Sequence, residues 1–268
     1  MQIPLFPLHT VLAPGIALPL HVFEERYREL VRHCLDTPSP FGVVLIREGS
    51  EVAPRGGHQE LSIAGVGTFA EIREANRYAD GRYDLLAVGV ARFQVREVRT
   101  DMAPYLVAEV DPLPDAPVGA DETEAERLVG RVTRRFVDYL RLLQPRDGET
   151  AEPIDVQMEV ETEEDDEAVA TGGADPAPGA ADGEPLPVDD PDATRAALRI
   201  PEDPTTLSFL LTGIVQVEQD RKQDLLEAAS AEERLLALDA LLDRELQLLG
   251  ARLGPYAVDR RVLADTAN

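Results

Sequence analysis

Histidine is one residue type in this sequence that could do chemistry. All four histidines lie within the first 58 residues: His9, His21, His33 and His58. A histidine cluster can hold a transition metal. No two of them, however, have the H-x-x-x-H spacing that places both rings on one helix face. His33 and Cys34 are adjacent, and on a helix they would point about 100° apart. We therefore expect no metal, and we interpret His21 as a hydrogen-bonded structural histidine.

Lysine is nearly absent: Lys222 is the only one, and the other basic residues are arginines. Phosphate-loop NTPases need a lysine in a G-x-x-x-x-G-K-[ST] loop, which Lys222 lacks. A Ser–Lys dyad or a Schiff-base enzyme would need the same residue. No serine lies in a G-x-S-x-G motif. The sequence therefore predicts a protein that is not an enzyme, with a hydrolase of unrecognised site as the alternative.

Two further patterns have an ordinary explanation and a functional one. Gly65-Val66-Gly67 lacks the third glycine and the helix start of a dinucleotide site, so we interpret it as a turn and expect no cofactor.

Four arginines form a stripe on one predicted helix, which could bind an acidic partner. We favour a solvated face with intrahelical pairs to Glu124 and Asp138. The stripe consists of Arg127, Arg131, Arg134 and Arg135.

The overall charge limits the partners. The 268 residues carry 51 acidic and 26 basic side chains, a formal net charge of −25. Such a chain repels phosphate backbones and anionic lipids, so we expect no nucleic acid and no membrane partner. Cys34 is the single cysteine, which excludes an intramolecular disulfide. Residues 1–23 lack the positive start of a signal peptide and contain four prolines, so we expect a cytoplasmic protein.

The acidity is concentrated in one segment. Residues 149–192 contain 16 acidic and no basic side chains, which leaves −9 for the rest of the chain. Self-repulsion and repeated Pro and Gly prevent such a segment from burying enough apolar surface to offset its chain entropy. We predict an acidic disordered linker over 147–198. It would act as a solvated spacer rather than as bait for basic partners.

Before the linker, short apolar runs predict a β-rich lobe over 1–118. Strands are expected at 41–46, 68–73, 83–90, 92–98 and 105–110, with a hairpin turn at Asp80-Gly81. Many short strands separated by turns favour a small barrel. One helix is expected at 24–35, where Tyr27, Leu30, Val31 and Cys34 recur at helical spacing.

The remaining segments are helical. A capping box at Thr123 and Glu126 opens a predicted first helix within 119–146, and further helices are expected within 199–254, before a tail at 255–268. Asp203-Pro204 opens one of them, and a second capping box at Ser230 and Glu233 opens another. Three amphipathic helices predict a small bundle.

Three blocks of sequence, in order, resemble the amino-terminal substrate-binding domain of Lon protease, in the stand-alone bacterial form without ATPase or protease domains. Cereblon carries a related domain. The blocks are 3–8 (IPLFPL), 12–15 (LAPG) and 18–28 (LPLHVFEERYR); 67–72 (GTFAEI), Asp80-Gly81, Gly89 and Arg92-Phe93; and Asp203-Pro204, 222–227 (KQDLLE) and 233–235 (ERL). The resemblance covers about residues 1–146 and 196–252.

The resemblance implies an α+β fold, a PUA-like β-barrel followed by a small helical bundle. It also implies recognition of unfolded or flexible polypeptides, with delivery to a protease or chaperone as a further expectation. Strand edges and apolar side chains would then make the contacts, and we expect them at Phe6, His21, Phe23 and Tyr27. The alternative, favoured for each phenylalanine taken singly, is that Phe6 and Phe23 belong to the core. RNA binding by the barrel is the weakest alternative, since it would need a basic, aromatic face.

Overall fold

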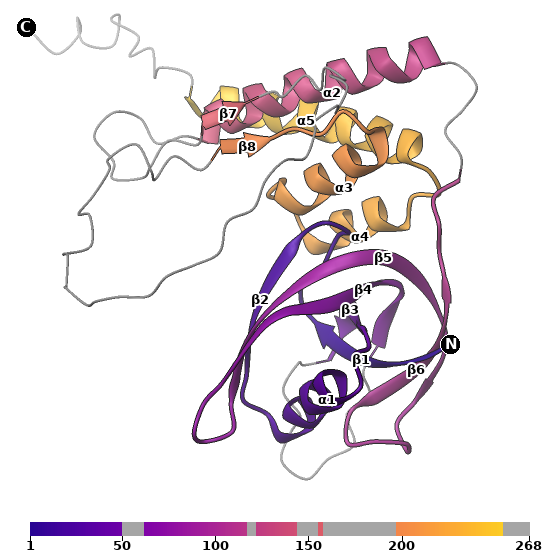
Figure 1. Ribbon diagram of the computed structural model, residues 1–268. Coiled ribbons are helices and arrows are strands. Elements are labelled where there is room, and N and C mark those ends of the chain that lie inside the picture. Colours follow the sequence, from indigo (N-terminus) through magenta and orange to yellow (C-terminus); the bar gives the residue numbers. More distant parts are fainter. Residues whose placement is uncertain (50–61, 117–121, 144–154, 158–196, 254–268) are drawn as a thin grey trace, which may run out of the picture. The chain divides into compact units, whose positions relative to one another are not determined.

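The computed structural model describes residues 1–49, 62–116, 122–143, 155–157 and 197–253 (Figure 1). The chain divides into two compact units. The larger comprises Met1–Leu142 and Glu202–Asn268, and the smaller comprises Leu143–Pro201. The described part of the larger unit contains six strands and five helices, which agrees with the predicted α+β class.

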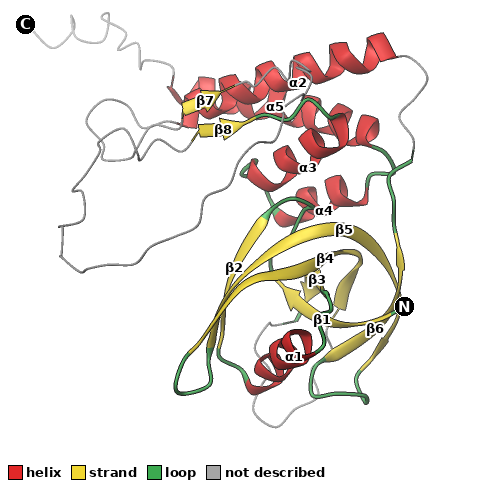
Figure 2. Cartoon of the chain, in the orientation of Figure 1, coloured by secondary structure: helices red, strands yellow, loops and turns green. Residues whose placement is uncertain are grey.

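Six strands build the β lobe. They are β1 (Gln2–Leu8), β2 (Ala17–Val22), β3 (Phe41–Glu48), β4 (Ser62–Arg77), β5 (Tyr83–Arg99) and β6 (Leu106–Pro112). Their order in the sheet is β2-β5-β4-β3-β1-β6, and β5 also pairs with β6. That additional pairing closes five strands into a barrel and leaves β2 attached to β5 outside the ring (Figure 2). The predicted barrel is confirmed.

Strand β5 changes partner along its length. Its first half pairs with β2 and its second half, from Phe93, pairs with β6. Next to β4 the register shifts because Val90 is an extra residue, a bulge that bends the strand. The two strands predicted at 83–90 and 92–98 are therefore one continuous strand.

Strands β1 and β2 were not expected, because prolines interrupt residues 1–23. Pro4 lies where β1 pairs only with β6, and Pro7 lies where it pairs only with β3. Pro19 belongs to β2, which pairs only with β5. Proline is tolerated in a strand wherever its missing N–H faces an unpaired side. Each of the three prolines meets that condition.

The predicted hairpin turn between β4 and β5 is confirmed. Gly81 has a φ of +85°, a conformation that glycine adopts without strain, and its amide donates to the Tyr78 carbonyl at 3.0 Å. The turn expected at Gly65-Val66-Gly67 is wrong, because these residues lie inside β4. A Cβ at Gly67 would come within 2.6 Å of the Val43 carbonyl oxygen, so close strand packing accounts for this glycine.

Helix α1 (Glu25–Asp36) packs its apolar side into the β lobe (Figure 1). Its buried residues are Tyr27, Leu30, Val31 and Cys34, the four whose spacing predicted a helix. They join one core cluster with β-strand residues such as Phe41, Val43 and Leu85. Helix α1 therefore fixes the position of the segments that flank it.

The other helices of the larger unit are α2 (Glu122–Leu143), α3 (Pro204–Ile214), α4 (Gln219–Glu227) and α5 (Ala231–Leu253). Asp203 caps α3 by accepting from the Thr206 amide at 2.7 Å, and Ser230 caps α5 through the Glu233 amide at 3.1 Å. The capping box predicted at Thr123 is wrong, because α2 already begins at Glu122. Helix α4 is one more helix than expected; it is short, and little of it is apolar.

Two of the stripe arginines connect α2 to α5. Arg131 Nε donates to the Asp239 carboxylate at 2.9 Å, and Arg135 Nη1 donates to the same carboxylate at 2.7 Å. Arg135 also pairs with Asp243 at 3.0 Å. Arg131 is exposed, as expected of a solvated face, but these two arginines make contacts between helices, which the sequence did not predict.

In the smaller unit, β7 (Asp155–Gln157) and β8 (Ala197–Arg199) pair in parallel. Both strands fall almost entirely within the range predicted as the acidic linker. The rest of that range, and the predicted tail at 255–268, lie outside the described residues.

Candidate functional site

Two of the four predicted binding residues, Phe6 and Tyr27, are buried in the core. Their rings stack with centroids 4.2 Å apart and an angle of 13° between the planes, and each residue is only 6% exposed. The stack joins β1 to α1. Phe6 and Tyr27 therefore support the surface from below, and their rings are not presented to solvent.

The other two, His21 and Phe23, are exposed and lie next to each other. Phe23 is 53% exposed, and its ring centroid is 6.3 Å from that of His21. On the other side of His21, at 6.4 Å, is the ring of Tyr78, which is 45% exposed. These three residues form what we call the aromatic patch. Tyr78 was missed from the sequence, although an aromatic side chain just before an Asp-Gly turn is a signal for exposure at a hairpin tip.

The aromatic patch is held in place by Asp84. His21 Nδ1 lies 2.6 Å from Asp84 Oδ1, and the two residues are paired across β2 and β5. The Tyr78 hydroxyl donates to the other oxygen of Asp84. The hydrogen bonds from Tyr78 and His21 lower the pKa of Asp84, and the same contact with Asp84 raises the pKa of Tyr78. His21 is therefore the hydrogen-bonded histidine that the sequence suggested.

A histidine paired with an aspartate is also part of a hydrolytic triad, but the geometry here differs. A triad needs a nucleophile at the second ring nitrogen. Next to His21 Nε2, at 3.4 Å, is Arg82 Nη1, and the Tyr78 oxygen contacts the aspartate rather than the imidazole. No group of three or more His, Cys, Asp and Glu side chains that could hold a metal occurs among the described residues, which exclude His58.

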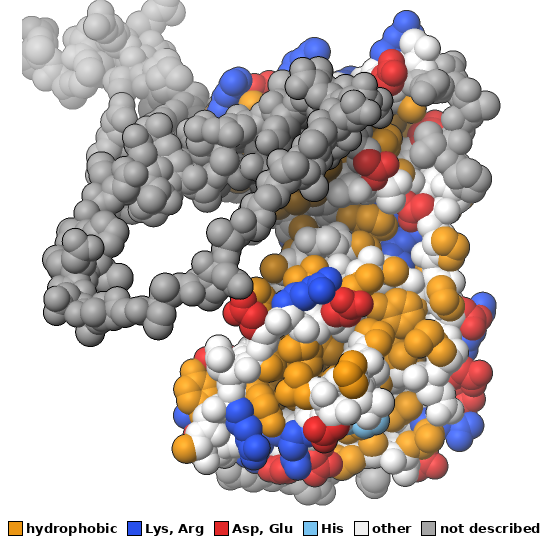
Figure 3. All heavy atoms as spheres, viewed as in Figure 1, with side chains coloured by type: hydrophobic (Ala, Val, Ile, Leu, Met, Phe, Trp, Pro, Cys, Tyr) orange, Lys and Arg blue, Asp and Glu red, His pale blue; other side chains and the backbone are white. Residues whose placement is uncertain are grey.

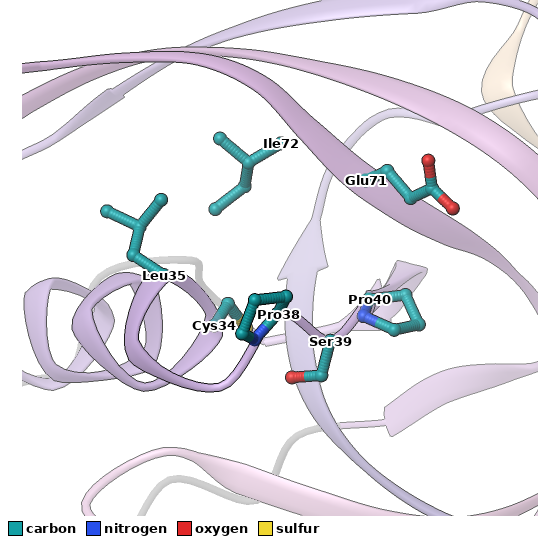
Figure 4. Close-up of a pocket in the computed structure, with 7 residues that line it drawn as sticks. All are labelled: Cys34, Leu35, Pro38, Ser39, Pro40, Glu71 and Ile72. Atoms are coloured by element: carbon teal, nitrogen blue, oxygen red, sulfur yellow. The ribbon is translucent and has the colours of Figure 1, made fainter.

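A pocket of about 340 Å³ opens at the other end of α1, between that end and β4 (Figure 4). Leu35 from α1 and Ile72 from β4 point into it from opposite sides (Figure 4). Its lining consists of Cys34, Leu35, Pro38, Ser39, Pro40, Glu71 and Ile72. Burial raises the pKa of the Cys34 thiol to about 11, so the thiol is protonated at neutral pH and is a poor nucleophile. Most of the lining residues are apolar, and Ser39 and Glu71 are the polar ones.

A cluster of buried charges joins the barrel to the helices. Arg92 from β5 donates to the Leu226 and Ala228 carbonyls at 2.6 and 2.7 Å. Arg234 from α5 donates to the Leu225 carbonyl at 3.0 Å. Both arginines also donate to the Asp115 carboxylate. They supply side-chain donors to carbonyls at the end of α4, where the backbone hydrogen-bond ladder of the helix runs out. The cluster is internal and has a structural role.

The visible surface of the β lobe is largely apolar. Hydrophobic side chains gather over its centre, and many of the charged side chains lie toward its rim (Figure 3). No helix in the described part of the chain is both long and apolar enough to cross a membrane.

Comparison with known proteins identifies the family. Residues 2–244 match the ATP-dependent protease La (LON) substrate-binding domain. The chain is 30% identical over 142 residues to Lon protease of Anaeromyxobacter dehalogenans, covering 53% of this chain and 16% of that protein. It is 33% identical over 118 residues to cereblon of Xenopus tropicalis, covering 42% of this chain and 24% of that protein. The chain thus matches only a small part of each relative's length.

Solved structures show the same fold. The Lon N-terminal domain protein of Xanthomonas campestris superimposes with a TM-score of 0.51 at 23% identity, covering 90% of this chain and 98% of that one. The N-terminal domain of Lon protease from the Mycobacterium avium complex gives 0.52 at 18% identity, covering 91% and 98%. With the family match spanning nearly the whole chain, this chain belongs to the LON substrate-binding domain family.

Proposed function

We propose that this chain recognises unfolded or flexible polypeptides through apolar contacts on its β lobe, without nucleotide and without a chemical step. Membership of a substrate-binding family supports the polypeptide as ligand. The observation that carries the proposal is the exposure of large apolar side chains around α1. Phe23 and Tyr78 lie near its start, and Leu35, 43% exposed, lies near its end. Exposed apolar side chains that gather on one part of a protein support a binding role.

The contacts that fix the aromatic patch support a binding role. Asp84 accepts a hydrogen bond from Tyr78 and pairs with His21, so both side chains lose less conformational freedom when a ligand binds. The Arg82 guanidinium lies 5.7 Å from the Tyr78 ring centroid and adds a cation–π contact. A fixed aromatic surface of this kind can contact many different apolar side chains. The absence of a nucleophile at His21 Nε2 among the described contacts favours binding over hydrolysis.

A finer proposal concerns what happens to the bound polypeptide. Among the relatives are several Lon proteases, and the family is named for the substrate-binding domain of an ATP-dependent protease. This supports delivery of the bound polypeptide to a protease or chaperone.

The test is a titration of the purified full chain into a fluorescently labelled, permanently unfolded protein at low and high salt. We expect saturable binding that persists at high salt, because apolar contacts are not screened whereas contacts between exposed charges are. Lack of binding at about 100 μM, a free energy near −5.5 kcal/mol, would contradict the proposal. Binding that disappears at high salt would show that charge, not apolar contact, drives the association.

A further inference from the structure

The outer half of β4 has one open edge. Strand β3 pairs with β4 only as far as the Phe41–Ala70 pair. Beyond that point, Glu71–Arg77 pairs with β5. Within the described ranges no other strand pairs with this stretch, so the backbone edge that faces away from β5 lacks a strand partner.

Two prolines explain why β3 does not continue along β4. Pro38 and Pro40 precede Phe41, the first residue of β3. A proline has no N–H to donate to a neighbouring strand, so the two prolines disfavour an extension of the β3–β4 ladder in this direction. The side chains of Arg73–Arg77 are exposed. An open, exposed edge of this kind is a template for another extended chain.

Helix α1 lies beside this edge and forms a wall. Near its start, Arg28 Nη1 donates to the Asp80 carbonyl at 3.1 Å, at the hairpin tip beyond Arg77. Near its end, Leu35 faces Ile72 across the pocket (Figure 4). Since these two contacts lie at opposite ends of both elements, α1 runs alongside the outer half of β4. The pocket lies at the inner end of the edge.

The two elements that border this open edge, helix α1 and the β4 segment Glu71–Arg77, each carry no net charge, unlike the chain as a whole. Helix α1 carries three acidic and three basic residues, and Glu71–Arg77 carries two of each. Several are paired with each other, such as Arg32 with Glu25 at 3.2 Å and Arg73 with Glu71 at 3.1 Å. Helix α1 and Glu71–Arg77 therefore exert no net electrostatic attraction on the chain's own acidic segment at 149–192. They are matched to a segment without net charge.

We infer that the open edge of β4, Ile72–Arg77, binds an extended, uncharged segment of the recognised polypeptide by strand addition. One apolar side chain of that segment would enter the pocket between Leu35 and Ile72. The inference rests on the proposed function and adds its mode of recognition. Backbone pairing accepts many sequences, and the pocket adds a preference for an apolar residue at one position.

The first experiment uses a pair of ten-residue peptides with alternating Val and Thr. One is unmodified, and the other is N-methylated at four consecutive central amides, which removes donors from both edges and keeps the side chains. The unmodified peptide is expected to bind the full chain at least 10-fold more tightly. Exchange of the amide hydrogens of 72–77 that point away from β5 is expected to slow at least 10-fold when that peptide saturates the protein.

A matched pair of variants tests the pocket. Leu35→Asp places a charge at its wall and is expected to weaken binding of the unmodified peptide at least 10-fold. Leu248→Asp is the control, because Leu248 is similarly exposed, at 47%, but lies on α5. It should leave peptide affinity unchanged. Unchanged thermal unfolding of both variants would show that the effect of Leu35→Asp is local.

The outcomes separate the inference from the proposed function. Equal affinity of the two peptides, with exchange slowed elsewhere, would overturn strand addition and leave polypeptide recognition intact. Binding of neither peptide nor unfolded protein would overturn both. If exchange is already slow in the free protein at those amides of 72–77 that point away from β5, the edge is occupied by this chain or by a second copy, which sedimentation would distinguish, and the inference is wrong.

Discussion

The guanidinium of Arg234 donates to both carboxylate oxygens of Asp115, at 2.9 and 3.0 Å, and its side chain is fully buried. Arg234 lies on α5 and Asp115 follows β6, so this pair ties the helices to the barrel. The guanidinium also lies 3.8 Å from the Phe209 ring centroid and donates to the Ser208 hydroxyl at 2.7 Å. The β lobe and these helices are thereby held together by one buried cluster.

Arg234→Met is predicted to destabilise the protein by about 3 kcal/mol, because it removes a buried charge that donates to both oxygens of Asp115 and leaves Arg92 as the remaining side-chain donor to that carboxylate. Arg244→Met on the same helix is the control; Arg244 is exposed, and its loss should cost less than about 0.5 kcal/mol. Urea unfolding of both variants measures the difference. Equal stability of the two would show that the cluster contributes nothing.

Asp239→Ala is predicted to loosen α2 from α5, because Arg131 and Arg135 both donate to this carboxylate. The expected loss is about 1 to 3 kcal/mol, since the carboxylate is mostly buried. Asp138→Ala removes an exposed partner of Arg141 on α2 itself and should change stability by less than about 0.5 kcal/mol. A cost for Asp239→Ala no larger than that for Asp138→Ala would contradict an interhelical role.

The burial of Cys34 predicts a dependence of stability on pH. Its pKa rises from 9.0 to about 11 in the folded protein, so the fold disfavours the thiolate. The contribution of the buried thiol to the free energy of unfolding is complete below pH 9.0, the pKa of the thiol in the unfolded chain. It is lost as the pH rises through about 11, the pKa in the folded protein. At most, the two-unit shift corresponds to about 3 kcal/mol. The free energy of unfolding of the wild type should therefore fall relative to that of Cys34→Ala between pH 8 and pH 11, by about 3 kcal/mol at most. A difference that stays constant over this range would contradict the prediction.

Residues 149–192 are predicted to be dispensable for folding, because 16 acidic side chains without a basic one repel each other. Replacing them with a short Gly/Ser linker should leave the thermal midpoint of the larger unit nearly unchanged. A fall of more than about 5 °C, equivalent to about 1 kcal/mol or more, would show that the segment packs against the fold.

Local sequence patterns were sufficient for some elements and insufficient for others. The helix at Glu25–Asp36 and the turn at Asp80-Gly81 follow from spacing and turn chemistry within a few residues. Strand β1 could not be predicted in this way. Pro4 and Pro7 are tolerated only because the side of the strand on which each lacks an N–H has no strand partner in the folded protein, and local sequence does not contain that information.

The same limit applies to the charged residues and the site. Arg131 is 108 positions from Asp239, and Arg234 is 119 positions from Asp115, so no local spacing predicts either pair. Phe23 and His21 were expected at the site because both lie in the first block of sequence that resembles the family. Tyr78 joins them only through the pairing of β2 with β5, which brings His21 opposite Asp84. The aromatic patch is therefore a product of the fold.

The central claim is that the β lobe binds polypeptide chains in their unfolded state and not in their natively folded state. The most direct measurement is the affinity of the full chain for one labelled protein in two forms, natively folded and permanently unfolded, by fluorescence anisotropy at high salt. The unfolded form should bind with a Kd below about 100 μM and the folded form should not bind detectably at that concentration. Equal binding of both forms, or binding of neither, would contradict the claim.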